Sequence, residues 1–381
     1  MTTQFDLTED QRAIQDMARK FTADAITPHA AHWDEAHHFP RDVVKASAAL
    51  GFGAIYVSEE SNGIGLGRLE AALIMEAMAY GCATTSSFIS IHNMAAWMID
   101  CYGSPEIKAK FLPDLVGMEK IASYCLTEPG SGSDAAALRT TACLDGDHYV
   151  VNGTKQFISG AGVNDIYVTM VRTGEDGPKG ISCLVLEKGM AGLSFGAPER
   201  KLGWNASPTA QVIMDNVKVP VANLVGAEGD GFRFAMAGLD GGRLNIGACS
   251  LGGAQRCLDE AIAYAKDRQQ FGQPIADFQN TQFMLADMAT ELEAARALLY
   301  LAAAKVTANA PDKSRFSAMA KRLATDTGSS VVDRALQLFG GYGYLKDYPI
   351  ERFWRDLRVH SILEGTNQVM RMIIGRDLLR Q

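Results

Sequence analysis

The sequence predicts an α+β fold with an N-terminal helical domain (residues 1–122), a middle antiparallel β domain (123–228) and a C-terminal helical bundle (229–381). Two observations lead to this prediction. Apolar residues recur with helical spacing in the first and last thirds and with a period of two between them. The order of helices, strands and helices contains no βαβ alternation. At 381 residues the chain is long enough for several domains.

Helix-start signals mark the first domain. Thr8 followed by Gln11 is a capping box, and Ser104 before Pro105 places an N-cap ahead of a proline at the first helical position. Between these signals, the segments 69–80 and 94–102 are apolar enough to form buried helices. The first third is therefore predicted to be helical.

The middle third has turn signals between short β-branched segments. Asp145-Gly146-Asp147 predicts a hairpin, and Asn152-Gly153 predicts a second turn. We expect strands on both sides of the first turn, at 140–144 and 148–151, and further strands at 166–172, 181–187 and 210–219.

Helical spacing returns after Gly231. A long apolar stripe is formed by Met284, Met288, Leu292, Ala295 and Leu299, and a shorter one by Leu258, Ile262 and Ala265. Stripes of this kind are typical of a core, so they predict a bundle and indicate no site.

Composition excludes several classes of function. The net charge of −8 argues against a general nucleic-acid binder, and no apolar run has the length of a membrane helix. Seven cysteines without a C-x-x-C pair predict neither disulfides nor a metal site, and we interpret the histidines between His29 and His38 as a solvated helix end and loop. The first residues, MTTQFDLTEDQ, resemble no targeting segment, so we expect a cytoplasmic protein of bacterial origin.

Two segments carry the chemistry. Tyr124–Asp134, YCLTEPGSGSD, is a short strand followed by a Gly/Ser loop whose backbone N–H groups and hydroxyls suit an anionic cofactor. Ile362–Gln368, ILEGTNQ, places one carboxylate, Glu364, between an apolar pair and Gly365. Burial raises the pKa of a carboxyl group toward the range in which it works as a base.

Together these segments resemble the signatures of the acyl-CoA dehydrogenase flavoenzyme family. The resemblance implies an acyl-CoA dehydrogenase-like fold, in which the middle domain is a small barrel and the C-terminal domain a four-helix bundle. It also implies FAD as cofactor. Many members of the family carry Trp where this chain has Phe157, so the aromatic contact with the flavin is smaller here.

The resemblance implies the following residue roles. FAD contacts fall on Tyr124, Leu126, Thr127, Gly132, Ser133, Phe157, Ile158, Ser159, Thr366, Asn367 and Gln368. Contacts with the FAD of an adjacent subunit fall on Arg268, Phe271, Phe278, Gln279, Gln337, Leu338, Gly340 and Gly341. Substrate contacts fall on Ser133, Asp240, Gly241, Gly242, Arg243, Gly365 and Arg376.

In the family, the position of Glu364 is the base that removes the α-proton of an acyl thioester while the β-hydride passes to flavin N5. Some relatives carry the base instead at the position of Gly242, which has no carboxylate here. Glu128 and Asp240 are weaker candidates for the base. The resemblance further implies electron-transfer flavoprotein as the electron acceptor and a homo-oligomer, expected to be a tetramer built as a dimer of dimers.

The substrate is predicted from three segments, GLDGGRLNI, GGYGYLKDY and RVHSILEGTNQVMR, which resemble the isobutyryl-CoA branch of the family. That branch desaturates a short 2-methyl-branched thioester in valine breakdown. Three alternatives stay open. These are a dehydrogenase for straight short-chain or 2-methylbutyryl-CoA, an acyl-CoA oxidase, and a catalytically silent subunit that binds flavin or acyl-CoA.

Overall fold

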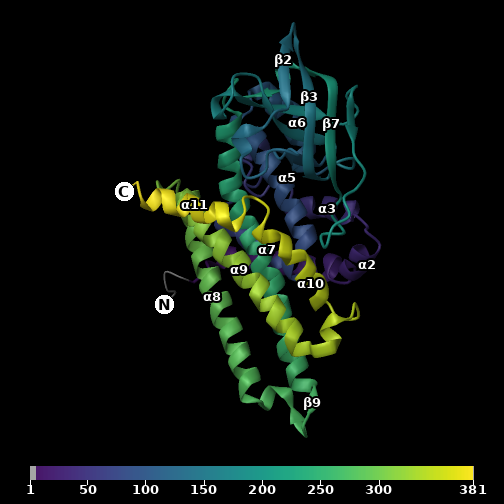
Figure 1. The fold of residues 1–381 in the computed structure, drawn as a ribbon, viewed down its shortest axis with the longest axis vertical. Coiled ribbons are helices and arrows are strands. Elements are labelled where there is room, and N and C mark those ends of the chain that lie inside the picture. Colours follow the sequence, from purple (N-terminus) through teal and green to yellow (C-terminus); the bar gives the residue numbers. More distant parts are fainter. Residues whose placement is uncertain (1–5, 381) are drawn as a thin grey trace.

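The computed structural model describes residues 6–380 (Figure 1). Its N-terminal part is helical, with α1 Glu9–Phe21, α2 Ala30–Glu35, α3 Arg41–Ala46, α4 Arg68–Gly81, α5 Ala83–Tyr102 and α6 Pro105–Val116. Both predicted caps are confirmed. The Thr8 hydroxyl accepts from the backbone N–H of Gln11 in a complete capping box, and the Ser104 hydroxyl accepts from the N–H of Ile107. Helices α4 and α5 contain the two predicted buried segments.

The middle part is one sheet. Its strands are β1 Ala122–Cys125, β2 Thr141–Asp145, β3 His148–Ser159, β4 Ile166–Arg172, β5 Ile181–Glu187, β6 Leu193–Phe195, β7 Thr209–Pro220 and β8 Leu224–Val225. The order is β6-β7-β3-β2-β4-β5-β8, with β1 paired to β4. The predicted hairpin joins β2 to β3, and all five predicted strands are present.

The sheet departs from the prediction in its pairing. It is mixed, because β1 and β2 both pair with β4 in parallel. The strand path ends at β6 and β8, and within the described residues no pairing joins these ends, so hydrogen bonds do not close the expected barrel.

The predicted turn at Asn152-Gly153 is wrong. Strand β3 continues through it, and the register with β7 shifts between Val151 and Gly153, which marks a bulge. Gly153 has φ +148°, and a Cβ there would lie 2.5 Å from Oγ1 of Thr140. The glycine permits a close approach inside the sheet.

The C-terminal part is a bundle of long helices, α7 Gly231–Asp267, α8 Gln279–Thr307 and α9 Lys313–Phe339. The shorter helices α10 Ile350–Leu357 and α11 Asn367–Leu378 follow them in the chain. A small hairpin, β9 Gln269–Gln270 and β10 Gln273–Pro274, links α7 to α8. Figure 1 shows this hairpin at the tip of the bundle, at the opposite end of the molecule from the large sheet. The predicted stripe on α8 is buried from Met288 to Leu299.

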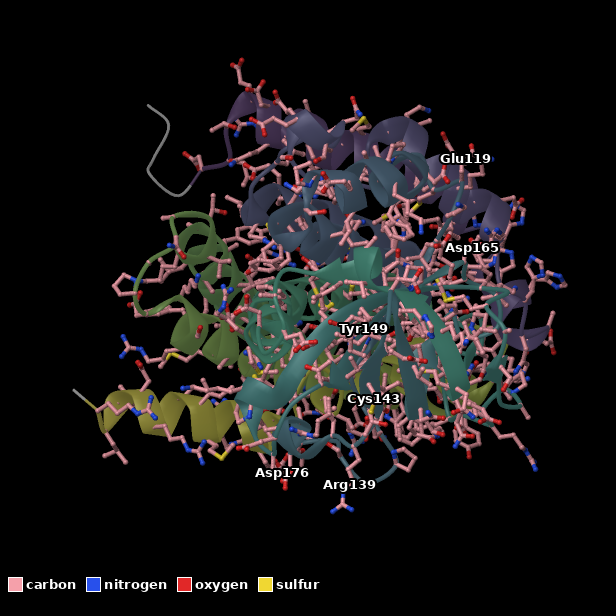
Figure 2. All side chains as sticks on the ribbon, turned by 90° about the horizontal axis from the view of Figure 1, so that it is seen from above. Glu119, Arg139, Cys143, Tyr149, Asp165 and Asp176 are labelled. Atoms are coloured by element: carbon pink, nitrogen blue, oxygen red, sulfur yellow. The ribbon has the colours of Figure 1, made fainter. Side chains whose placement is uncertain are left out.

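The helical and β parts are fastened to each other directly. Arg41 on α3 forms an ion pair with Asp165, just before β4, with an Nη2–Oδ2 distance of 2.7 Å. Figure 2 shows Asp165 where the purple N-terminal helices meet the sheet. The predicted boundaries lie beside the start of β1 and shortly before α7, and they stay predictions.

No helix within residues 6–380 combines the length and apolar character that a membrane span requires. Across the same residues, the structure brings no three His, Cys, Asp or Glu side chains into an arrangement suited to a metal ion.

Candidate active site

A cavity of about 980 Å³ opens where β1, β3, α7 and the segment before α11 meet. It brings together the two motifs that the sequence singled out. Its lining includes the predicted base Glu364 and three of the predicted substrate contacts, Arg243, Gly365 and Arg376. It also includes the predicted FAD contacts Tyr124, Leu126, Thr127, Gly132, Ser133, Phe157, Ile158 and Ser159. Its walls are mostly apolar, as a flavin ring and an acyl chain require.

Glu364 lies on the turn between the 3₁₀ segment Arg358–Ser361 and α11. Its backbone has φ +52° and that of Gly365 has φ +90°, so two consecutive residues are left-handed. The carboxyl oxygen Oε2 of Glu364 is buried and accepts no hydrogen bond from any described residue. Burial raises the pKa of this carboxyl group to about 7, although the nearby Arg243 and Lys321 lower it. A base tuned in this way suits proton abstraction near neutral pH.

Two buried cations hold the carbonyl groups of this turn. Nε of Arg243 donates to the carbonyl oxygen of Glu364 at 3.3 Å, and Nζ of Lys321 donates to that of Gly365 at 2.8 Å. Sequence reasoning missed Lys321, because a lysine on a helix is ordinarily exposed. Lys321 lies three residues from each of the buried Ala318 and Ala324 on α9, and this helical spacing was the available signal.

Asp240 is not available as the base. Its Oδ1 accepts from Nη1 of Arg243 at 2.8 Å, and its Oδ2 accepts from the hydroxyl of Ser314. Asp240 does not line the cavity, and its contact with a substrate stays a prediction.

Gly241 and Gly242 also lie outside the cavity lining. A Cβ at Gly242 would lie 2.2 Å from Oε2 of Glu364, and one at Gly241 would lie 2.3 Å from Nη1 of Arg68. These glycines of α7 leave room for the two side chains, and their contact with a substrate stays a prediction.

Glu128, the other weaker candidate, fixes the cofactor loop. Its carboxylate accepts from the backbone N–H groups of Arg139 and Thr140 at 2.6 and 2.9 Å, and from Nζ of Lys155 at 2.7 Å. Burial opposes ionisation of Glu128, but Lys155 and the hydrogen bonds outweigh it and leave the pKa lowered. Lys155 is fully buried and also donates to the carbonyl of Leu126. The Arg139 end of this loop projects from the sheet in Figure 2.

The other side of the cavity fits a flavin. Phe157 is left-handed at φ +58° and 64% exposed, so an aromatic face is presented to the cavity. A Cβ at Gly132 would meet nothing within 4 Å, so the loop backbone is open to a ligand. The Tyr124 hydroxyl and Nε1 of Trp204 are buried without a hydrogen-bond partner in the described residues. These unsatisfied groups and the exposed ring suit a polar-edged aromatic cofactor.

The wall around Trp204 was missed by sequence reasoning, since its loop has no periodic pattern. It is held by Asp356 of α10, whose Oδ1 accepts from the backbone N–H of Trp204 at 2.6 Å and whose Oδ2 accepts from the Thr84 hydroxyl at 2.8 Å. Burial raises the pKa of Asp356 to about 6.

Thr366, Asn367 and Gln368 do not line the cavity. The Thr366 hydroxyl caps α11 by accepting from the N–H of Val369 at 3.2 Å. Asn367 is buried against Lys321 and Thr325, and Gln368 is exposed. Within a single chain Thr366 and Asn367 support the turn and the helix, and the contact of the three residues with FAD stays a prediction.

The FAD residues assigned to an adjacent subunit lie elsewhere on the chain. Arg268, Leu338, Gly340 and Gly341 line a second cavity, of about 380 Å³. Phe271, which is 94% exposed, lies in the turn between β9 and β10 at the bundle tip. Phe278, Gln279 and Gln337 line neither cavity. One chain therefore does not bring the two predicted FAD groups together.

Comparison with known sequences gives a match over almost the whole chain. Residues 8–119, 123–217 and 229–379 match the families described as acyl-CoA dehydrogenase N-terminal, middle and C-terminal domains. The chain belongs to the acyl-CoA dehydrogenase family. The predictions of family, fold class, enzyme class and FAD cofactor are confirmed by these matches and those below.

Similar proteins within the acyl-CoA dehydrogenase family include two isobutyryl-CoA dehydrogenases named as mitochondrial. The one from Dictyostelium discoideum is 58% identical over 373 residues, covering 98% of this chain and 90% of its own length. The one from Bos taurus is 52% identical over 375 residues, with the same coverage. These names give no support to a bacterial origin.

Solved structures of this family superpose closely. Butyryl-CoA dehydrogenase from Megasphaera elsdenii has a TM-score of 0.96 at 37% identity, covering 99% of this chain and 100% of its own. A chain from a structure described as the electron transferring flavoprotein of Acidaminococcus fermentans has a TM-score of 0.97 at 42% identity, with full coverage of both chains.

Proposed function

We propose that this acyl-CoA dehydrogenase converts isobutyryl-CoA to methacrylyl-CoA, with Glu364 as the catalytic base. The observation that carries the proposal is the buried Oε2 of Glu364, which accepts no hydrogen bond from the described residues and adjoins the cavity. The two isobutyryl-CoA dehydrogenases at 58% and 52% identity support the choice of acyl group.

Glu364 removes the α-proton of the thioester. Its carboxylate is a stronger base than an exposed glutamate, because burial raises its pKa to about 7. Charge then develops on the thioester oxygen and needs hydrogen-bond donors. No described residue accepts a hydrogen bond from the backbone N–H of Glu364, so this N–H is free to donate to the thioester oxygen.

FAD, when bound, supplies the acceptor for the β-hydride. Thr127, Ser133 and the segment 157–159 would hold its ring, and Arg243 and Gly365 would lie on the substrate side. Arg376, at the C-terminal end of α11, would contact the substrate from the outer rim.

We further propose a homo-oligomer, a tetramer built as a dimer of dimers, in which a second copy supplies the distal FAD residues. Arg268 has a permanent charge suited to pyrophosphate, but it lies with the second cavity at the other end of the bundle. Phe271 and Tyr344 are 94% and 84% exposed, as expected for residues that a partner covers. Arg268→Ala should lower flavin content while the light-scattering mass is kept. Full flavin occupancy would contradict the shared site.

Electron-transfer flavoprotein is proposed as the electron acceptor, supported by family membership and by the Acidaminococcus structure. The oxidase alternative predicts stoichiometric hydrogen peroxide from substrate and air without an added acceptor. Cytoplasmic location stays a prediction.

An anaerobic titration tests the proposed substrate. Isobutyryl-CoA should bleach the flavin absorption of the purified enzyme at lower concentration than butyryl-, 2-methylbutyryl- or octanoyl-CoA. A strong preference for octanoyl-CoA would defeat the short-branched assignment. Flavin that no thioester bleaches would favour the silent binding subunit.

A further inference from the structure

Lys321 on α9 is fully buried, and its ammonium group contacts the turn that bears the base. Nζ donates to the carbonyl oxygen of Gly365 at 2.8 Å and to Oδ1 of Asn367 at 2.9 Å. Within residues 6–380 no carboxylate forms an ion pair with it. Burying a cation without a carboxylate partner is unfavourable, so the hydrogen bonds of the ammonium group must offset the cost of its burial.

The turn needs external support. Glu364 is a non-glycine residue in the left-handed region, and Gly365 follows it in the same region. Such a backbone persists where its surroundings fix it. Here Arg243 of α7 binds the carbonyl of Glu364, while Lys321 of α9 binds the next carbonyl, so two helices hold the base from two sides.

We propose that Lys321 is a positioning residue for the base: its ammonium group locks the Glu364–Gly365 turn and the start of α11 onto α9, so that the carboxylate stays directed into the cavity. The inference rests on the proposed role of Glu364. Asn367 extends the same lock, because it accepts from Lys321 and donates to Oδ1 of Asp326 at 2.6 Å.

The charge of Lys321 also acts on the base. Arg243 and Lys321 both lower the pKa of Glu364 against the effect of burial. Burial lowers the pKa of Lys321 to about 8, partly offset by Glu364. The other titratable groups that interact with this pair are Tyr56, Tyr124, Cys249, His360 and Asp326. Removing the lysine charge therefore raises the pKa of Glu364.

The test is Lys321→Met in the full-length, flavin-loaded enzyme, with Lys313→Met as the matched control on the same helix. The ammonium group of Lys313, at the start of α9, donates to the side chain of Asn309. We expect kcat of Lys321→Met to fall roughly 10- to 100-fold, as for the loss of one charge-assisted hydrogen bond that orients the base. The acid limb of kcat/KM against pH should move to higher pH, with flavin content and KM little changed. The control should match the wild type.

Chemical rescue separates positioning from packing. Lys321→Ala leaves a cavity at Nζ, so added ethylammonium should raise both its kcat and its melting temperature, whereas tetramethylammonium, which cannot donate, should do neither. If Lys321→Met loses its flavin, Lys321→Gln takes its place and must show the same shift of the acid limb.

Wild-type kcat with an unmoved acid limb would overturn the inference, as would a variant that loses only thermal stability. The proposed function fails on a different observation. If Glu364→Gln is active, Glu364 is not the base and the proposed function fails. If Glu364→Gln is inactive and Lys321→Met behaves as the wild type, only the positioning role of Lys321 is refuted.

Discussion

Gly242 of α7 faces the carboxylate of Glu364 so closely that a Cβ on the glycine would lie 2.2 Å from Oε2. The two residues are 122 positions apart in the chain, and the site depends on the absence of a side chain at the first of them. Some members of the family carry the base at the position of Gly242. In this chain the carboxylate of Glu364 occupies the space beside that glycine.

Gly242→Ala should therefore inactivate the enzyme without unfolding it. The atom that must move is the end of a flexible side chain, and alanine in a helix is favoured over glycine by about 1 kcal/mol. We expect a melting temperature equal to or above that of the wild type and a kcat at least roughly 100-fold lower, because a misplacement of the base by about 1 Å has that cost. Thermal unfolding and steady-state kinetics check this.

The matched control for this substitution is Gly247→Ala on the same helix, whose Cβ would lie 2.9 Å from Cδ1 of Leu299, the end of a flexible side chain, and 3.4 Å from Cβ of Ala324. It should keep its activity. Normal turnover in Gly242→Ala would show that the carboxylate does not need its observed position.

The activity should depend on pH through Glu364. The base must be ionised, and burial raises its pKa to about 7. The kcat/KM for isobutyryl-CoA should thus rise with pH and level off above about 7. A profile that is flat from pH 5 to 8 would mean that the group is not buried in the working enzyme.

Stability should show the opposite dependence on pH. The pKa of Glu364 rises from 4.5 to about 7 on folding, so the folded state holds the proton more tightly. Its contribution to stability is complete below the unfolded value and is lost as the pH rises through about 7. Glutamine cannot ionise, so Glu364→Gln should gain up to about 3 kcal/mol over the wild type between pH 5 and 8.

Denaturant unfolding at several pH values measures this gain. Glu60→Gln, at an exposed position, is the control, and its unfolding should follow that of the wild type at each pH. A constant difference between Glu364→Gln and the wild type would refute the raised pKa.

The ion pair between Glu128 and Lys155 should hold the flavin loop. Lys155→Met leaves a buried carboxylate without its cation, so we expect a loss of about 3–5 kcal/mol in stability and a lower flavin content. Glu128→Gln combined with Lys155→Met should lose less than the sum of the single changes, since the two side chains interact at 2.7 Å. Additive losses would show that the pair is not coupled.

Much of the site was predictable because its signals are local. A carboxylate beside an apolar pair and a glycine is visible in a seven-residue segment, and so is the Gly/Ser loop after β1. Lys155 and Lys321 were not predictable as parts of the site, because their acceptors, a backbone carbonyl group and a side-chain oxygen for each, lie on other elements far away in the sequence.

The fold shows the same contrast. The hairpin between β2 and β3 follows from a turn signal, whereas Asn152-Gly153 gives a similar signal inside a continuous strand. Asn-Gly favours a turn only where the neighbouring strand does not pair across it, and β7 does. The pairing with β7 therefore decides the outcome, and it is a tertiary contact.

The most direct measurement is the turnover of isobutyryl-CoA by purified Glu364→Gln. The amide keeps the size and burial of the side chain but cannot take a proton. We predict a folded, yellow protein that binds the thioester and has kcat lower by about four orders of magnitude or more. Turnover near the wild-type rate, with full flavin occupancy, would contradict the role of Glu364 as the base.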